Sequence, residues 1–194
     1  MSYVLPRAPG SWRDVARRGS RLGAVALAGA LLTLAPAAPL TGGVQVAAAD
    51  VGEGDRAPEP KGAKDGAGKE WTLASLRGGW VVITFGGSWC KPCKKELPAW
   101  DRLAGKWAGK VTFVAINLDH DIAKGKKFMD GLKVKNMVRV YAPEDKAPAA
   151  DIYAPPSQPT SYVIDPRGIV RKLHTSYYSG DEGKMDKLLA ALVK

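Results

Sequence analysis

Beyond residue 70, short apolar runs alternate with longer segments in which apolar residues keep helical spacing. Runs rich in valine, isoleucine and aromatic residues, bounded by glycine, proline or charge, are typical of buried strands. They lie at 80–85, 111–119, 137–142, 160–165 and 169–174. Apolar side chains every three or four residues predict helices over 89–107, over 121–132, and around Met185, Leu188, Leu189 and Leu192 at the C-terminus.

The order of these segments predicts one α/β domain. Its first half is a βαβ unit with a parallel pair of strands, and a hairpin followed by the last helix, a ββα unit, completes a mixed sheet flanked by helices. Pro98 lies inside the first helix and should kink it, because proline has no N–H and its ring clashes with the preceding turn. The stretch "SWCKPCKKELP" falls where the first core strand passes into this helix.

Residues 1–49 have the pattern of a secretory signal peptide. A basic segment at 7–21 precedes the apolar run 22–35, and the small-residue end "VAAAD" indicates cleavage after Ala49. The apolar run is shorter than a membrane-spanning helix requires, so an uncleaved membrane anchor is the second interpretation. The pattern predicts a periplasmic or otherwise extracytoplasmic protein. Residues 50–70, rich in glycine, proline and charge, predict a flexible lead-in to a domain over 71–194.

The charge of the chain argues against one class of partner. The formal charge is +10, and it falls to +6 when the five arginines and one aspartate of residues 1–49 are removed. The remaining lysines do not form a basic block interleaved with aromatic residues, so nucleic-acid binding is not indicated. Moderate basicity in an exported protein indicates binding to anionic surfaces or acidic partners more than binding to nucleic acid.

The chain has two cysteines, Cys90 and Cys93, and they could be a staple, a metal clip or a redox centre. A disulfide that closes so short a loop stabilises a fold by only roughly 2 kcal/mol. Structural zinc needs about four ligands, whereas the only histidines, His120 and His174, lie far apart in the sequence. Copper held by two thiolates and a histidine stays open as a weaker alternative.

A redox centre explains the neighbouring residues best. Cys90 is predicted at a helix N-terminus, where unpaired N–H groups and the helix dipole favour a thiolate. Lys91 adds positive charge, and Pro92 suits a first helical turn because it has no N–H to leave unpaired. Cys93, one turn further on, is placed to attack a mixed disulfide formed at Cys90.

The sequence also resembles a known family. "TFGGSWCKPCKKELPAW" is similar to the "NFWATWCxPCxxExP" signature of thioredoxin-fold proteins of the TlpA/ResA type, which are exported thiol–disulfide oxidoreductases. The resemblance continues in "VGEGDRAPEP", in "WTLASLRGGWVVITF", in "VAINLD" and in "QPTSYVIDPRGIV" downstream. It therefore covers the chain beyond residue 50 and implies a thioredoxin-like fold.

The resemblance implies roles for individual residues. Pro159 would be a cis-proline that faces the disulfide and positions the substrate backbone, and Gln158 would flank the substrate groove. Glu96 would tune the thiols, although a solvated helix carboxylate is the plainer interpretation, and Trp89 would be the family's aromatic before the first cysteine, or simply a core side chain. No separate cofactor or metal is implied, because the Cys90–Cys93 disulfide is itself the redox centre.

The resemblance further implies that the protein, expected to be a monomer, reduces disulfides of other exported proteins, with apocytochrome c as one substrate, and is recharged by a membrane electron donor. Three departures leave the direction open. Thr84 stands where thioredoxin has a buried aspartate, Gly86-Gly87 replace the usual Trp-Ala, and Lys91 should make the couple more oxidising. A thiol oxidant or isomerase, or a non-catalytic module that binds copper or a partner, are the alternatives.

Overall fold

The computed structural model describes residues 50–194, and its centre is a six-stranded sheet in the order β1-β4-β3-β2-β5-β6. The strands are β1 Lys64–Asp65, β2 Trp80–Gly86, β3 Val111–Asn117, β4 Val138–Tyr141, β5 Thr160–Ile164 and β6 Val170–Thr175. The helices are α1 Cys93–Lys106, α2 Ile122–Gly131, α3 Ala149–Tyr153 and α4 Asp181–Leu192, with a 3-10 turn at Leu73–Leu76. The predicted signal peptide and its cleavage site lie outside the described residues.

The pairing of the strands confirms the predicted mixed sheet. Strand β2 is parallel to β3, and β3 is parallel to β4, with α1 and α2 as the connections. On the other side of β2 the strands β5 and β6 form an antiparallel hairpin. Strand β2 is therefore central and its sequence is apolar nearly throughout, because both of its faces are covered.

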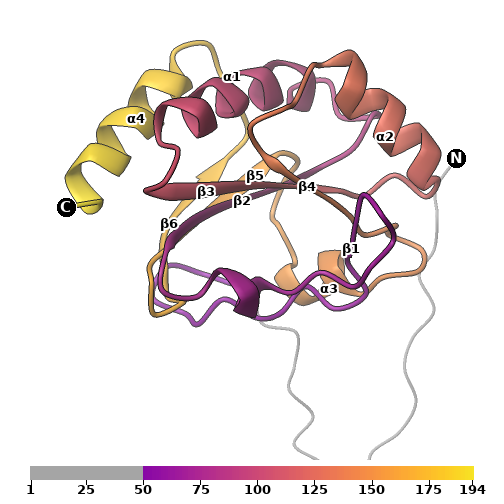
Figure 1. Ribbon diagram of the computed structural model, residues 1–194, viewed down its shortest axis with the longest axis horizontal. Helices are drawn as coiled ribbons and strands as arrows, with labels where there is room; N and C mark the ends of the chain where they lie inside the picture. The colour runs from indigo at the N-terminus through magenta and orange to yellow at the C-terminus, as the bar shows by residue number, and fades with distance from the viewer. Residues whose placement is uncertain (1–49) are drawn as a thin grey trace, which may run out of the picture. The chain divides into compact units, whose positions relative to one another are not determined.

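Helices cover both faces of the sheet. Figure 1 shows α1, α2 and α4 on one face, with α3 and the chain before β2 on the other. Alternate residues of β2 point to opposite faces, so Val82 packs with Trp100 of α1, while Ile83 and Phe85 pack with Tyr153 of α3. Among the helices of residues 50–194, none combines the length and the apolar character needed to cross a membrane.

The structure differs from the expected flexible lead-in at residues 50–70. This segment has no core of its own, but the domain holds it: the N–H of Gly54 donates to the carbonyl of Val170 at 2.8 Å, and that of Ala57 to Gly168 at 2.9 Å. Ala57 and Ala63 are buried, and β1 pairs with the sheet edge at β4. Glycine and proline in a sequence suggest flexibility, whereas here they shape an irregular backbone that is fixed by long-range hydrogen bonds.

The first helix begins later than predicted, at Cys93 instead of Trp89. Pro92 is its N-cap, and before it residues 87–90 form a turn in which the N–H of Cys90 donates to the carbonyl of Gly87 at 3.0 Å. The helix then continues through Pro98 to Lys106.

Candidate active site around Cys90 and Cys93

The two cysteines lie where β2 ends and α1 begins, as the sequence predicted. They form a disulfide with their Cα atoms 5.3 Å apart, and Cys90 and Cys93 are only 4% and 1% exposed. Strand β2 ends at Gly86, and Gly87 follows it in the loop before the cysteines. A Cβ atom at Gly86 would lie 2.5 Å from the Cys93 Sγ, so the missing side chain leaves room for the inner sulfur.

The sulfur of Cys90 receives a hydrogen bond from the start of the helix. The backbone N–H of Cys93 donates to the Cys90 Sγ at 3.2 Å. This N–H lies in the first turn of α1, where backbone N–H groups have no carbonyl partner inside the helix. In the reduced protein, the same donor and the positive end of the helix dipole would favour the thiolate form of Cys90.

Asp119, which follows β3, fixes the loop before Cys90. Its carboxylate accepts hydrogen bonds from the Ser88 backbone N–H at 2.9 Å and from the Ser88 hydroxyl at 2.6 Å, and another from the Asn117 side chain at 2.8 Å. Burial raises the pKa of Asp119, but these hydrogen bonds outweigh it, so the pKa lies below its ordinary value. Sequence reasoning matched this strand end to the family without assigning a role to Asp119. The signal was an acid at the end of the apolar run 111–119.

Glu96 is buried and not a solvated carboxylate, so the plainer interpretation of this residue is wrong. Its Oε2 accepts a hydrogen bond from the Thr84 hydroxyl at 2.8 Å, and its Oε1 accepts one from the Ser161 hydroxyl at 3.0 Å. The indole N–H of Trp100 donates to the same Ser161 oxygen at 2.8 Å. Burial raises the pKa of Glu96 to about 7, and the hydrogen bonds from Thr84 and Ser161 oppose that rise only in part.

Thr84 binds a buried acid instead of marking the absence of one. The residue stands where thioredoxin has a buried aspartate, which by itself suggests that a buried acid is missing. Instead, Thr84 holds the carboxyl group of Glu96, so a buried acid is supplied from α1.

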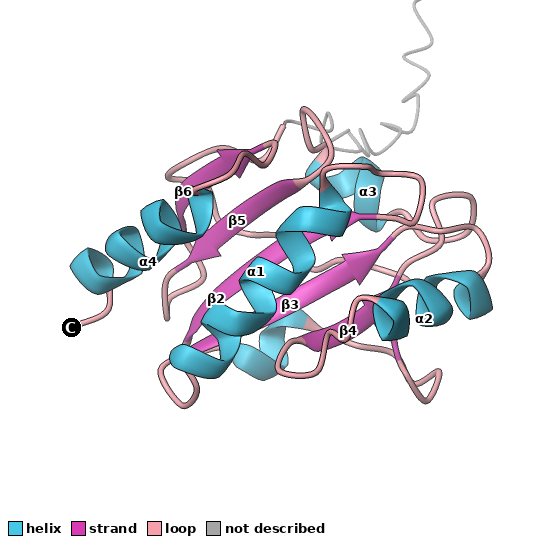
Figure 2. Ribbon diagram, turned by 90° about the horizontal axis from the view of Figure 1, so that it is seen from above, coloured by secondary structure: helices cyan, strands magenta, loops and turns pink. Residues whose placement is uncertain are grey.

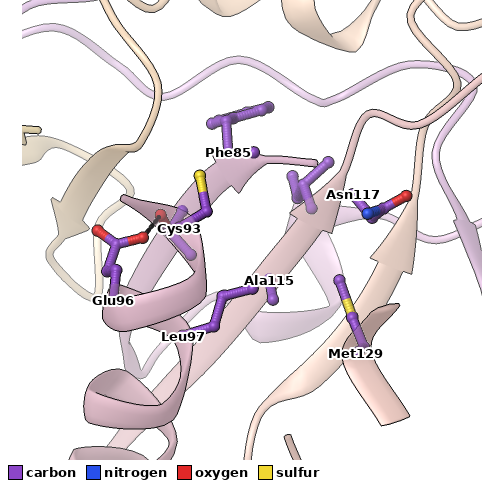
Figure 3. A pocket seen from close by; sticks show the side chains of 10 residues that line it. Phe85, Cys93, Glu96, Leu97, Ala115, Asn117 and Met129 are labelled. Carbon is purple, nitrogen blue, oxygen red and sulfur yellow. Dashed lines mark hydrogen bonds between the residues drawn. The ribbon is translucent and has the colours of Figure 1, made fainter. Parts of the chain in front are cut away.

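A small cavity connects Glu96 with the inner cysteine. Cys93, Glu96, Asn117 and Met129 are among the residues that line it, and it has room for about one water molecule. Figure 3 shows Cys93 and Glu96 on the first turns of α1, with Asn117 and Met129 across the cavity. The inner cysteine and Glu96 therefore line one water-sized cavity beside the disulfide.

Pro159 is placed next to the cysteine loop by the pairing of β5 with β2. The Gln158–Pro159 peptide bond is cis, and Thr160 directly after it pairs with Phe85 at the end of β2. The backbone N–H of Ser176 donates to the Pro159 carbonyl at 2.7 Å and ties this loop to the end of β6. The structure thus brings Pro159 and its neighbour Gln158 to the end of β2 that leads into the disulfide loop.

Trp89 is not a core residue, because 48% of its surface is exposed. Its indole lies against Gly87, where a Cβ atom would come within 2.6 Å of the indole nitrogen. Lys91 is exposed beside it.

The two histidines lie at separate places. The His120 Nδ1 is 3.3 Å from a carboxylate oxygen of Asp145, and the His174 Nε2 is 3.2 Å from one of Asp181. Burial lowers the pKa of His174, although Asp181 opposes the effect.

Comparison with known proteins places this geometry in a family. Residues 53–173 match the family described as the AhpC/TSA family. The thioredoxin-like protein YneN of Bacillus subtilis is 30% identical over 131 residues, which are 63% of this chain and 71% of that protein. The thiol-disulfide oxidoreductase ResA of Bacillus cereus is 32% identical over 108 residues, 55% of this chain and 61% of that protein.

A solved structure supports the fold over a larger share of the chain. A thiol:disulfide interchange protein of the DsbE type from Chlorobium tepidum superposes with a TM-score of 0.65 at 28% identity, and the match covers 73% of this chain and 99% of that one. The chain spans about three fifths of the length of the ResA relative and seven tenths of that of YneN. From the family match, the thioredoxin-like sheet and the cysteine pair at the start of α1, we conclude that the chain belongs to the AhpC/TSA family and is one of its thiol–disulfide oxidoreductases.

Proposed function

We propose that the protein acts outside the cytoplasm and reduces disulfides of other exported proteins through its Cys90–Cys93 pair. One observation carries the proposal: a helix-start N–H donates to the Cys90 sulfur, while a buried carboxyl group of raised pKa shares a cavity with Cys93. The two sulfurs therefore have different surroundings, as a nucleophile and a resolving thiol require. Export rests on the signal-peptide pattern of residues 1–49.

The reaction begins with the reduced protein. The Cys90 thiolate attacks one sulfur of a substrate disulfide, the substrate S–S bond breaks, and a mixed disulfide forms with release of one substrate thiolate, which takes up a proton. Cys93 then loses its proton to Glu96 and attacks the Cys90 sulfur. The mixed disulfide bond breaks, the second substrate sulfur leaves as a thiolate and takes up a proton, and two electrons have passed from the protein to the substrate. Pro159, which lies next to the end of β2, holds the substrate backbone beside Cys90.

The cycle closes when a dithiol donor at the membrane reduces the Cys90–Cys93 disulfide again. The disulfide itself is the redox centre, and no separate cofactor enters the cycle. Apocytochrome c with its cysteine pair in the disulfide form is one candidate substrate, in line with the resemblance to the TlpA/ResA type. Trp89 stands exposed at the mouth of the site and contacts the incoming substrate chain.

Two measurements test this function. Cys93→Ala should accumulate mixed disulfides between Cys90 and exported proteins, whereas Cys90→Ala should accumulate none. The reduction potential measured in glutathione buffers should be about −250 mV, as for a reductant. A potential near about −120 mV would instead assign the protein to the oxidants, and a Cys93→Ala protein that traps nothing would contradict disulfide exchange altogether.

A further inference from the structure

An open groove lies beside the disulfide, and the thiol chemistry alone does not account for it. Its volume is about 380 Å³, and it is lined by Ser88, Trp89, Lys94, Lys124, Lys127 and Phe128. Trp89 directly precedes Cys90, Lys94 directly follows Cys93, and the other lysines come from α2. Figure 2 shows α1 and α2 on the same face of the sheet. The groove thus begins at the reactive pair and extends to the second helix.

The charged side chains that line the groove all carry one sign. Lys94, Lys124 and Lys127 are exposed, and no carboxylate is among the lining residues. Within residues 50–194, Lys94 and Lys127 have no ion-pair partner, while the Lys124 nitrogen lies 4.0 Å from an oxygen of Asp119, a carboxylate already bonded to Ser88. Lysines from two different elements therefore converge on one groove with most of their charge uncompensated.

The groove also has an aromatic wall. Trp89 is one of two large hydrophobic side chains that are exposed within the described chain, and the half-buried Phe128 lines the same groove. Gly87 allows the indole of Trp89 to lie against the backbone, and the exposed part of the ring offers an apolar surface to the groove. An extended peptide can place an apolar side chain on such a surface and its carboxylates near the lysines.

We propose that this groove, lined by Trp89, Lys94, Lys124 and Lys127, binds an acidic segment of the substrate protein next to its reactive cysteine. The proposal rests on the proposed function, because it names the class of substrate that the same thiols reduce. Electrostatic attraction across the groove speeds encounter with acidic substrates and fixes which side of the substrate disulfide meets Cys90. Basic or neutral substrates lack this advantage.

The test compares two synthetic peptides that contain the same internal disulfide, flanked by glutamates in one and by glutamines in the other. The reduced protein is mixed with each peptide, quenched with acid and analysed by chromatography for the rate constant of peptide reduction. Each rate is divided by the rate with 2,2′-dithiodipyridine, a small uncharged disulfide that reports thiol reactivity alone. The variants are the pair Lys124→Gln with Lys127→Gln and, as a control of equal charge change, the pair Lys110→Gln with Lys187→Gln. Lys110 and Lys187 do not line the groove.

The wild type and the control pair should reduce the glutamate peptide roughly 3- to 10-fold faster than the glutamine peptide at low salt, and added salt should remove the preference. The variant with Lys124→Gln and Lys127→Gln, called the groove pair, should lose most of this preference for the glutamate peptide. Equal rates for both peptides, or a preference that survives in the groove pair, would overturn the proposal while leaving the thiol chemistry intact. A protein that fails to react even with 2,2′-dithiodipyridine would instead overturn the proposed function. Loss of binding to phosphatidylglycerol vesicles in the groove pair, with the peptide preference unchanged, would assign the groove to a membrane surface and refute the peptide occupant.

Discussion

The buried carboxyl group of Glu96 should make the stability of the protein depend on pH in an unusual direction. Its pKa is about 7 in the folded protein against an ordinary value of 4.5, so the folded state binds more protons than the unfolded state between these two values. The free energy of unfolding therefore falls as the pH rises through this window. The stabilisation is fully present below pH 4.5 and is lost above about pH 7.

The size of the effect follows from the two pKa values. At about 1.36 kcal/mol per pH unit, the loss attributable to Glu96 between about pH 5 and about pH 8.5 is on the order of 2–3 kcal/mol. Glu96→Gln removes this titration and nearly preserves the shape of the side chain. Its amide oxygen can accept from one of the two hydroxyls that now bond Glu96, and its amide N–H can donate to the other.

The assay is urea unfolding of the oxidised wild type and of Glu96→Gln at a series of pH values. The difference between the two proteins at each pH cancels the opposite contribution of His174, whose lowered pKa makes stability rise with pH. The variant should gain on the order of 2–3 kcal/mol relative to the wild type between about pH 5 and about pH 8.5. A difference that stays constant over this range would show that Glu96 is ionised throughout, and the proton transfer proposed for Cys93 would lose its basis.

Three further predictions concern the neighbours of the disulfide. In the reduced protein, alkylation of Cys90 by iodoacetamide should show a pKa clearly below the ordinary value of about 8.5, because a backbone N–H favours the thiolate; an unshifted profile would contradict its role as nucleophile. Ser161→Ala leaves the buried indole N–H of Trp100 without its acceptor and should cost about 1–3 kcal/mol in urea unfolding, an effect that a mere surface hydroxyl would not have. Asp119→Asn removes the carboxylate that holds Ser88 and should lower stability by about 1–3 kcal/mol and slow the reduction of a protein disulfide. Unchanged rates in this variant would mean that the loop keeps its shape without the anchor.

The sequence predicted the core elements well because their signal is local. Strand β2 has apolar residues on both faces, and the helical face of α1 contains Leu97, Trp100 and Leu103, so each pattern already reflects the burial that the fold produces. The position of the cysteines between these two elements followed directly. The family signature added Pro159 and Glu96, which no local pattern would have singled out.

The parts that the sequence did not predict depend on contacts between distant residues. Glu96 resembles a solvated carboxylate in the sequence because its partners, Thr84 and Ser161, lie 12 and 65 residues away in the chain. The predicted start of α1 is too early because the turn before it depends on Asp119, 31 residues beyond Ser88. The lead-in resembles a flexible segment because its hydrogen-bond partner Val170 lies near the other end of the domain.

The donor that stabilises the Cys90 sulfur is a main-chain group, and this matters for dissecting the two thiols. Replacing the Cys93 side chain by alanine or serine leaves the N–H of residue 93 in place, so the outer sulfur keeps its partner when the inner sulfur is gone. Alanine or serine at residue 93 therefore removes the resolving thiol without removing the N–H that favours the Cys90 thiolate. Proline alone among the common residues would delete the N–H together with the thiol. Comparing an alanine and a proline at this one position would separate the contribution of the main chain from that of the second sulfur.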